Sequence, residues 1–101
     1  MSRYKLSARA FANLEKIVAY TTRTWGHAQC ERYVNLIEAA CEEIAANPEL
    51  DRLCHDVRTG LMRSAVGQHV LFYRRQDLTV RIVAILHRRM VPARHLADED
   101  G

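Results

Sequence analysis

The stretch Val80-Arg81-Ile82-Val83-Ala84-Ile85-Leu86-His87-Arg88-Arg89-Met90 decides how this chain folds. Seven of its eleven positions are apolar and most of these side chains are β-branched, which is typical of a strand buried on both faces. It is the longest such run in the chain, so the sequence predicts a central strand here. The end of the run changes character abruptly, because His87, Arg88 and Arg89 gather basic side chains where the strand leaves the core.

Two shorter strands are predicted just before this stretch. An extended pattern covers residues 57–66, and residues 69–75 form a second run of strand-favouring side chains. The connections at Gly67-Gln68 and at residues 76–78 are short enough to be tight turns. Because tight turns force neighbouring strands to run antiparallel, residues 57–88 are predicted to form a three-stranded meander.

Helical periodicity replaces the strand pattern in the first half of the chain. Residues 3–6 form a predicted edge strand, and Ser7 supplies an N-cap for a helix that ends near Gly26. A second helix runs from Ala28 to Asn47-Pro48, because proline excludes the residue before it from the α conformation. The short junction predicts an antiparallel helical hairpin. The predicted buried stripes are Phe11, Leu14, Ile17, Val18, Thr21 and Trp25 in the first helix, and Cys30, Val34, Ile37, Cys41 and Ile44 in the second.

These elements predict an α+β fold in the order βααβββ, with the two-helix hairpin packed on one face of a mainly antiparallel sheet. Side chains alternate between faces along a strand. On the final strand, the face predicted to contact the helices consists of Val80, Ile82, Ala84 and Leu86, and the opposite face of Arg81, Val83, Ile85, His87 and Arg89. On that opposite face Val83 and Ile85 would form an exposed apolar floor inside a basic rim, which is typical of a partner-binding surface. The alternative is that the N-terminal strand and the tail cover this floor within the molecule.

Composition indicates one folded domain with a basic second half. Of the 101 residues, 49% are hydrophobic and 27% charged, so we expect a single globular domain over residues 1–96 and a disordered tail over residues 97–101. The net charge is only +3, yet residues 61–96 contain seven arginines and a single acid, Asp77. This asymmetry predicts an anionic partner, which could be nucleic acid, an acidic protein surface or an enzyme that handles nucleic acid.

Membrane, metal and cofactor sites are not predicted. No stretch approaches the ~20 apolar residues of a membrane span, and no signal-like apolar segment follows the N-terminus. With its three cysteines expected to remain reduced, the protein is predicted to be cytoplasmic. A zinc site could be drawn from His27, Cys30, Cys54 and His55, but their spacing matches no usual ligand pattern. We expect Cys30 and Cys41 to lie in the core.

The remaining chemical candidate is a cationic group in the second half of the chain. Arginines can stabilise a charged phosphate and a histidine can transfer protons, so a metal-independent ribonuclease is one interpretation. The other is a docking surface without a reaction, which the near absence of acidic side chains favours. Tyr73 is more simply explained by packing, and His69 by exposure beside a turn. The group consists of Arg63, His69, Tyr73, Arg74, Arg75, Arg81, His87, Arg88 and Arg89.

An ordered set of motifs resembles the ParE toxins of the RelE/ParE superfamily over nearly the whole chain. The motifs are Tyr4-x-Leu6-Ser7-x-x-Ala10, Trp25-Gly26-x-x-Gln29-x-x-x-Tyr33, Ala46-x-Pro48, Arg58-x-Gly60, Gly67-x-His69-Val70-x-Phe72-Tyr73-Arg74 and Ile82-Val83-Ala84-Ile85-Leu86-His87-x-Arg89-Met90. The resemblance implies a RelE/ParE-like fold. It also implies a toxin of a type II toxin–antitoxin pair that inhibits DNA gyrase and blocks replication.

The resemblance further implies a hetero-oligomer with a ParD-like antitoxin, which has a DNA-binding ribbon-helix-helix region and a segment that folds around the toxin. DNA would then be contacted only through the antitoxin or gyrase. No residue is predicted to be catalytic. The predicted target-contacting residues are His87, Arg88, Arg89 and Met90. The predicted antitoxin-binding residues are Leu61, Arg63, Tyr73, Arg81, Val83 and Ile85.

Two alternatives stay open on the sequence. The RelE-like relatives are ribosome-dependent mRNA endoribonucleases, for which Arg63, Tyr73, Arg81 and His87 would be the nearest candidates. A toxin-like domain that has lost its activity and only binds an antitoxin is the other alternative.

Overall fold

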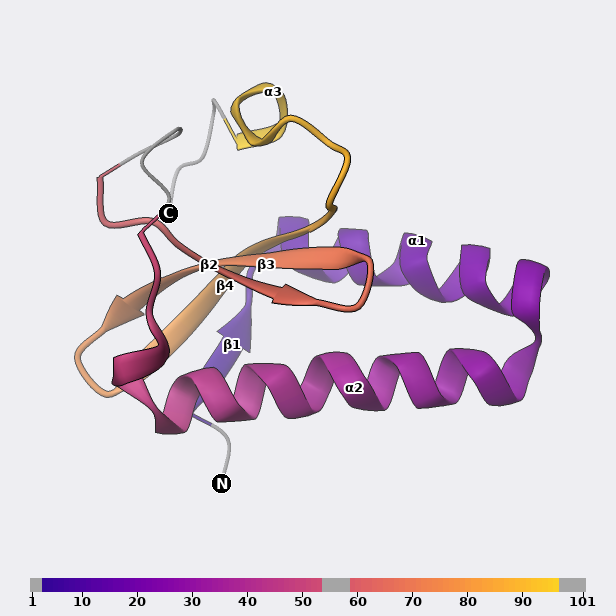
Figure 1. Cartoon of the computed structure of the whole chain (residues 1–101), viewed down its shortest axis with the longest axis horizontal. Coiled ribbons are helices and arrows are strands. Elements are labelled where there is room, and N and C mark those ends of the chain that lie inside the picture. Colours follow the sequence, from indigo (N-terminus) through magenta and orange to yellow (C-terminus); the bar gives the residue numbers. More distant parts are fainter. Residues whose placement is uncertain (1–2, 54–58, 97–101) are drawn as a thin grey trace.

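The computed structural model describes residues 3–53 and 59–96, in which two long helices pack with a four-stranded sheet (Figure 1). The elements in chain order are β1 (Tyr4–Leu6), α1 (Ala8–Trp25), α2 (His27–Ala46), the 3-10 helix η1 (Pro48–Leu50), β2 (Met62–Val66), β3 (His69–Gln76), β4 (Thr79–His87) and α3 (Pro92–Leu96). The predicted α+β class and βααβββ order are confirmed, and α3 extends them. The start of the predicted strand 57–66, the residues Cys54 and His55, and the predicted tail 97–101 lie outside the described residues.

The helical hairpin has locally specified ends. Ser7 caps α1, because its Oγ accepts a hydrogen bond from the N–H of Ala10 at 3.0 Å. Gly26 alone separates the two helices with a φ of 94°, a backbone conformation that favours glycine. Asn47 ends α2 and Pro48 begins η1, as expected for a residue that precedes proline.

The buried face of α1 is rotated from the predicted stripe. Ile17 and Thr21 are buried as predicted, but Phe11, Val18 and Trp25 are 54%, 37% and 68% exposed. The prediction is wrong for these three because an apolar stripe wider than the contact surface does not show which of its edges is buried. Four of the five residues predicted for the stripe of α2 are buried, namely Cys30, Ile37, Cys41 and Ile44, and the fifth, Val34, is partly buried. No helix in the described part of the chain has the length and apolar content needed to cross a membrane.

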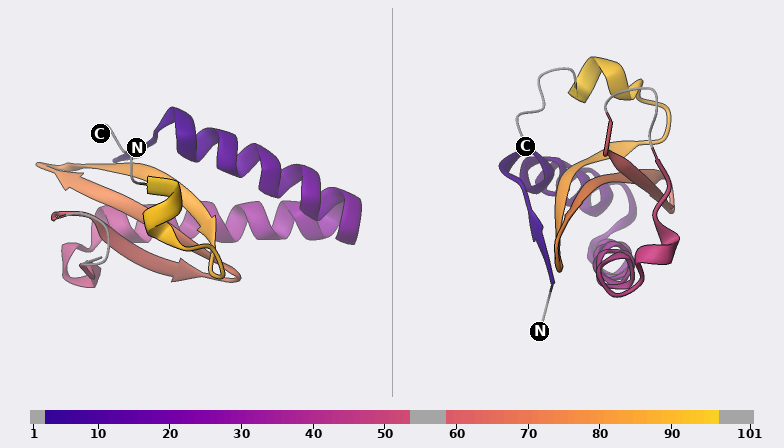
Figure 2. Two further views of the ribbon diagram at one scale, coloured as in Figure 1. Left: turned by 90° about the horizontal axis from the view of Figure 1, so that it is seen from above. Right: turned by 90° about the vertical axis from the view of Figure 1, so that its left-hand side faces the viewer.

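β4 is the central strand, as predicted, in a sheet with the order β1-β4-β3-β2. β2, β3 and β4 form the predicted antiparallel meander. β1 lies at the edge and pairs in parallel with β4, with Tyr4 opposite Val80 and Leu6 opposite Ile82. The right-hand view of Figure 2 shows α2 and α3 on opposite sides of the sheet. The strand that carries the longest apolar run is therefore covered on both of its faces.

A β-bulge interrupts the pairing of β3 with β4. Phe72 pairs with Ala84, and the next residue, Tyr73, pairs with Ile82, so Val83 has no partner of its own on β3. An extra residue on one strand reverses the alternation of its side chains beyond that point. The bulge therefore decides which side chains of β4 face the helices.

The predicted faces of β4 are correct only before this bulge. Val80 and Ile82 lie in the helix-side core, but beyond the bulge it is Ile85 that joins them. The prediction that Ala84 and Leu86 face the helices is wrong, and so is the placement of Ile85 on the opposite face. The outer cluster consists of Leu61, Phe72, Val83, Ala84, Leu86 and Leu96, with Val70 packed against it.

The third helix closes the outer face of the sheet. Leu96 of α3 is fully buried and packs in the same cluster as Val83. Val83 is only 4% exposed and Ile85 only 2% exposed. The predicted exposed apolar floor is therefore wrong. The alternative in which the tail covers this face is confirmed for Val83, while Ile85 is covered by the core beneath the helices.

Candidate partner-binding site

The predicted target-contacting residues follow the end of β4 in a tight turn. The N–H of Arg88 donates to the carbonyl oxygen of Gln68 at 2.9 Å, and the N–H of Met90 donates to that of His87 at 2.9 Å. The N–H of Arg89 donates to Nδ1 of His87 at 3.1 Å. These bonds hold the backbone of the turn, while the side chains of Arg88, Arg89 and Met90 are exposed. Such a turn can present two cations and one apolar side chain to a partner.

Two hollows flank this turn, and His87 and Met90 line both of them. We call the first the basic pocket; its volume is about 600 Å³. Among the described residues that line it there is no acidic side chain, so it favours an anionic ligand. Its basic lining consists of Arg52, Arg63, His87 and Arg88, and its apolar lining of Leu50, Ala65, Val70, Phe72, Met90 and Pro92.

The second hollow, the hairpin pocket, has a volume of about 590 Å³ and lies between α1, the first half of α2 and the end of β4. Tyr20 and Trp25 line it and are 56% and 68% exposed. Tyr and Trp side chains are enriched among the residues that carry binding energy in protein interfaces. Sequence reasoning missed this pocket because Trp25 was assigned to the core. The seven-residue spacing of Phe11, Val18 and Trp25 indicates a second apolar row on α1, but only Trp25 of this row lines the pocket.

Most of the predicted antitoxin-binding residues are buried. Tyr73 and Ile85 lie in the helix-side core. Leu61 and Val83 lie in the outer cluster with Leu96. All four side chains are between 0% and 4% exposed. Arg63 differs from them, because it is exposed and lines the basic pocket.

Arg81 is the other predicted antitoxin-binding residue with an accessible side chain. It lies opposite Lys5 on β1 and opposite Arg74 on β3. Its Nε is buried and has no hydrogen-bond partner among the described residues, whereas Nη1 of Arg74 donates to the carbonyl oxygen of Thr59 at 2.9 Å. Like charges directly opposite each other across a sheet are unfavourable. Both residues that pair with Arg81 across the sheet are therefore basic.

Tyr73 takes part in a hydrogen-bond network on the helix side of the sheet. Its hydroxyl donates to Oδ1 of Asp51 at 2.7 Å. Arg75 donates to the same carboxylate from Nε at 2.9 Å and from Nη2 at 2.8 Å, and Nη2 also donates to the carbonyl oxygen of Ile44 near the end of α2 at 2.7 Å. The hydrogen bond from Arg75 lowers the pKa of Asp51 against the opposing effect of burial. Burial, and then the hydrogen bond to Asp51, raises the pKa of Tyr73. Tyr73 is thus an anchor of the fold.

The four candidate nuclease residues are not gathered at one place. Arg63 and His87 line the basic pocket. Tyr73 is buried on the helix side, where it bonds to Asp51. Arg81 precedes His87 by six positions on β4, a separation of about 20 Å at the usual rise of a strand. The structure therefore brings together only two of the four.

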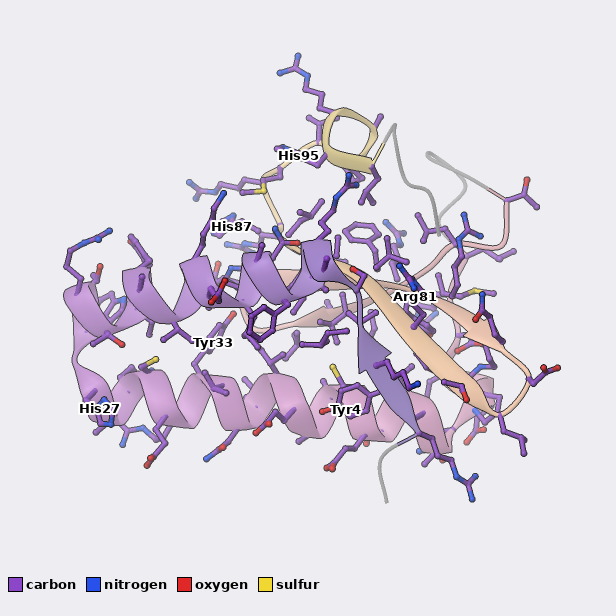
Figure 3. All side chains as sticks on the ribbon, turned by 180° about the vertical axis from the view of Figure 1, so that it is seen from behind. Tyr4, His27, Tyr33, Arg81, His87 and His95 are labelled. Carbon is purple, nitrogen blue, oxygen red and sulfur yellow. The ribbon has the colours of Figure 1, made fainter. Side chains whose placement is uncertain are left out.

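His69 is partly buried, and its predicted exposure beside a turn is wrong. Its Nδ1 lies 2.6 Å from the hydroxyl oxygen of Tyr33, and its ring packs edge-on against that of His87 with the centroids 5.4 Å apart. Figure 3 shows Tyr33 between the two long helices, in the same half of the molecule as His87. No local sequence signal indicates this cluster, because its members come from three different elements.

The cysteines contribute to the core. Cys30 and Cys41 are 6% and 1% exposed, as predicted. Burial, followed by the charge of Glu38, raises the pKa of Cys41 to about 12, so this thiol stays protonated. In residues 3–53 and 59–96 there is no group of three or more side chains that could hold a metal ion.

Comparison with protein families finds one match over most of the chain. The model of the ParE toxin of the type II toxin–antitoxin system parDE matches residues 4–92. Those residues include both long helices, the whole described sheet and the turn after β4.

Full-length relatives are similar to the chain from end to end. Toxin ParE1 of Mycobacterium tuberculosis (strain H37Rv) is 41% identical over 96 residues, which cover 94% of this chain and 98% of the relative. Toxin ParE1 of Caulobacter vibrioides is 38% identical over 96 residues, with 95% and 99% covered. Toxin ParE of Escherichia coli is 34% identical over 99 residues, with 97% and 96% covered.

A solved structure agrees with the fold. A chain of the chromosomal ParDE TA system from P. aeruginosa superimposes with a TM-score of 0.73, over 86% of this chain and 96% of that chain. The two sequences are 15% identical, so this likeness concerns the fold alone.

Proposed function

This chain belongs to the ParE toxin family of type II toxin–antitoxin systems, and from that premise we propose that it inhibits DNA gyrase and thereby blocks replication. The family match over residues 4–92 carries the proposal. We propose that the toxin acts in the cytoplasm, where gyrase and the chromosome are found.

Target contact is assigned to His87, Arg88, Arg89 and Met90. Arg88 and Arg89 supply two exposed cations, and Met90 is 43% exposed beside them. The backbone hydrogen bonds of the turn support this assignment, because a preorganised turn loses little conformational entropy when it binds.

The toxin is proposed to act by binding, without a catalytic step. Two observations support this. Arg81 and His87 lie about 20 Å apart along β4, and the hydroxyl of Tyr73 is engaged with Asp51 on the other side of the sheet. A general acid or base must reach its substrate within hydrogen-bond distance, so these groups do not form one reaction centre.

A ParD-like antitoxin with a ribbon-helix-helix region is the proposed partner that neutralises the toxin in a hetero-oligomer. DNA is reached only through this antitoxin or gyrase. The basic pocket suits an antitoxin segment with acidic and apolar side chains, whose ordering cost is offset by the surface it buries. Arg63 contacts this segment directly, and Arg81 offers it a second anion site.

The other four predicted antitoxin-binding residues act from within the fold, because Leu61, Tyr73, Val83 and Ile85 are buried. A segment in the basic pocket would also contact His87, Arg88 and Met90, which line it. The antitoxin would therefore neutralise the toxin by covering part of the residues that contact gyrase.

The purified toxin is expected to inhibit gyrase supercoiling and to accumulate cleaved DNA. Arg88→Ala, Arg89→Ala and Met90→Ala should each weaken inhibition about tenfold, the effect of removing one interface side chain worth ~1.4 kcal/mol. Arg94→Ala, which removes an exposed arginine of α3, is the matched control and should inhibit like the wild type.

Three other outcomes would contradict this proposal. Ribosome-programmed cleavage of mRNA with gyrase unaffected would indicate a RelE-like endoribonuclease. Binding of the antitoxin without growth arrest by the free toxin would indicate an inactive domain. Equal inhibition by all four variants, with the fold confirmed by circular dichroism, would remove the turn after β4 from the gyrase interface.

A further inference from the structure

A chain of polar contacts joins α2 to the turn that follows β4. Its three side chains are Tyr33 from α2, His69 from the start of β3 and His87 from the end of β4. Their rings follow one another, with centroids 5.5 Å apart for Tyr33 and His69 and 5.4 Å apart for His69 and His87. All three side chains line the hairpin pocket.

Gly67 allows Tyr33 to approach this closely. A Cβ at Gly67 would lie 2.7 Å from the ring of Tyr33, and the φ of Gly67 is 58°. The hydroxyl oxygen of Tyr33 accepts a hydrogen bond from the N–H of Gln68 at 3.0 Å. The phenol of Tyr33 therefore packs against the turn between β2 and β3. In the same turn, the carbonyl oxygen of Gln68 accepts a hydrogen bond from the N–H of Arg88.

The hydrogen-bond distances indicate which atoms of Tyr33 and His69 carry the protons. The Tyr33 hydroxyl can donate to Nδ1 of His69 at 2.6 Å or to the carbonyl oxygen of Val66 at 3.4 Å, and the shorter contact is the stronger bond. Donation to Nδ1 leaves His69 neutral with its proton on Nε2. On His87 the Nδ1 also acts as an acceptor, because the N–H of Arg89 donates to it at 3.1 Å.

We propose that Tyr33 and His69 are positioning residues that hold, through His87, the turn Arg88–Met90 in one conformation, and that protonation of His69 releases this turn. Tyr33 and His69 touch neither the target nor the antitoxin in this scheme. The proposal rests on the proposed function for its consequence in gyrase inhibition, whereas the conformation of the turn can be measured without gyrase.

Protonation of His69 disrupts these contacts for a geometric reason. A proton on Nδ1 of His69 would remove the acceptor of the Tyr33 hydroxyl. The hydroxyl would then have to donate to the carbonyl oxygen of Val66, which is 3.4 Å away.

The surroundings favour the neutral form of His69 at neutral pH. The charged residues that line the two pockets around these rings are Lys16 from α1, Arg52 from the segment before β2, Arg63 from β2 and Arg88 after β4. All four are cations, and no acid occurs among the described lining residues. Burial, followed by the charge of His87, lowers the pKa of His69 from its ordinary value of 6.5.

Nuclear magnetic resonance of the full chain tests the proposal directly. At pH 7.5 the wild type should show the imidazole of His69 with its proton on Nε2. Tyr33→Phe keeps the ring but removes the hydroxyl, and should lower the exchange protection of the amides of Arg88 and Arg89 by about five- to tenfold, the effect of one lost hydrogen bond. The pKa of His69 is lowered from 6.5, so the wild type should lose the same protection only below that pH, after correction for intrinsic exchange.

Tyr33→Phe also separates positioning from titration. It lacks the hydrogen bond that protonation of His69 would break, so its protection should be lowered already at neutral pH, with no further loss in acid. His95→Gln, which removes an exposed histidine of α3, should behave like the wild type. Full protection in Tyr33→Phe, or an acid-induced loss in Tyr33→Phe equal to that of the wild type, would overturn the proposal.

A gyrase measurement separates this proposal from the proposed function. If the wild type inhibits gyrase, Tyr33→Phe should need about fivefold more protein for half-inhibition, and acid should weaken its inhibition less than that of the wild type. If the wild type does not inhibit gyrase, the proposed function fails, but the resonance experiment still tests the conformation of the turn. Should Tyr33→Phe not fold, the wild-type pH series and His69→Gln, which has no imidazole to protonate, supply the decision.

Discussion

Tyr73 and Tyr33 both bring a phenol hydroxyl to the boundary between the sheet and α2, but the groups around them differ. Tyr73 donates to the carboxylate of Asp51, which Arg75 neutralises with two hydrogen bonds while it also reaches the carbonyl of Ile44. Tyr33 bonds to the imidazole of His69 and to the backbone of Gln68, beside an open pocket.

The difference shows how one fold can combine an ion-paired network that resists change with a neutral network that depends on protonation. Removing one member of a partly buried ion pair leaves the other charge without a partner, so the Tyr73 network resists change. Neutral hydrogen bonds contribute less, and the bond from Tyr33 depends on the protonation of His69. The first network closes the end of the hairpin, and the second lies beneath the proposed target-contacting turn.

Arg75→Ala should have the largest effect on stability. It removes the cation that neutralises Asp51, which keeps only the hydrogen bond from Tyr73, and it removes one donor to the carbonyl of Ile44. The side chains of Arg75 and Asp51 are each only 17% exposed. We expect the free energy of unfolding to fall by about 3 kcal/mol, measured by urea titration with circular dichroism. Arg89→Ala removes an exposed arginine and should change it by less than ~0.5 kcal/mol. Equal losses in the two variants would contradict the ranking.

Tyr73→Phe should destabilise the protein more than Tyr33→Phe does. A hydrogen bond to a carboxylate is about twice as strong as one between neutral groups, so we expect losses of about 2 and about 1 kcal/mol. A double-mutant cycle sharpens the comparison: Asp51→Asn should couple to Tyr73→Phe and be additive with Tyr33→Phe. A larger loss in Tyr33→Phe would reverse the roles of the two networks.

Acid should weaken the two networks in separate pH ranges. Of the three predictions on stability, this one should show the smallest effect. The folded protein lowers the pKa of His69 from 6.5 and that of Asp51 from 3.8. A lowered pKa means that the unfolded chain binds protons first, so each contribution is complete above the ordinary value and is lost as the pH falls through the folded one.

The urea midpoint of the wild type should therefore fall in one step below about pH 6.5 and in another below about pH 3.8. His69→Gln should lack the first step and Asp51→Asn should lack the second. A single acid transition that neither variant alters would show that other groups control the pH dependence.

Much of the backbone could be predicted from local chemistry. The β-branched run before His87 indicated the central strand, Ser7 indicated the start of α1, and Pro48 indicated the end of α2. These predictions succeed because each depends on the conformational preferences of a few consecutive residues.

The candidate site was harder to predict because it depends on register. The bulge at Val83 moves Ile85 to the helix side and places Ala84 and Leu86 under α3. Strict alternation cannot indicate an extra residue whose only evidence is the pairing with β3. The exposure of Trp25 and the burial of His69 likewise depend on how α1 and α2 are rotated against the sheet.

The sequence by itself determined the order of the elements, the central place of β4 and the motifs by which the family could be suspected. Periodicity, capping and proline chemistry act within single elements, so they can be read without a structure. Only the tertiary structure decided which face of β4 contacts the helices, that α3 covers the outer face, and that Tyr33 and His69 lie behind the turn at Arg88. Those features arise where elements distant in sequence meet, and packing alone selects among the arrangements that the local preferences allow.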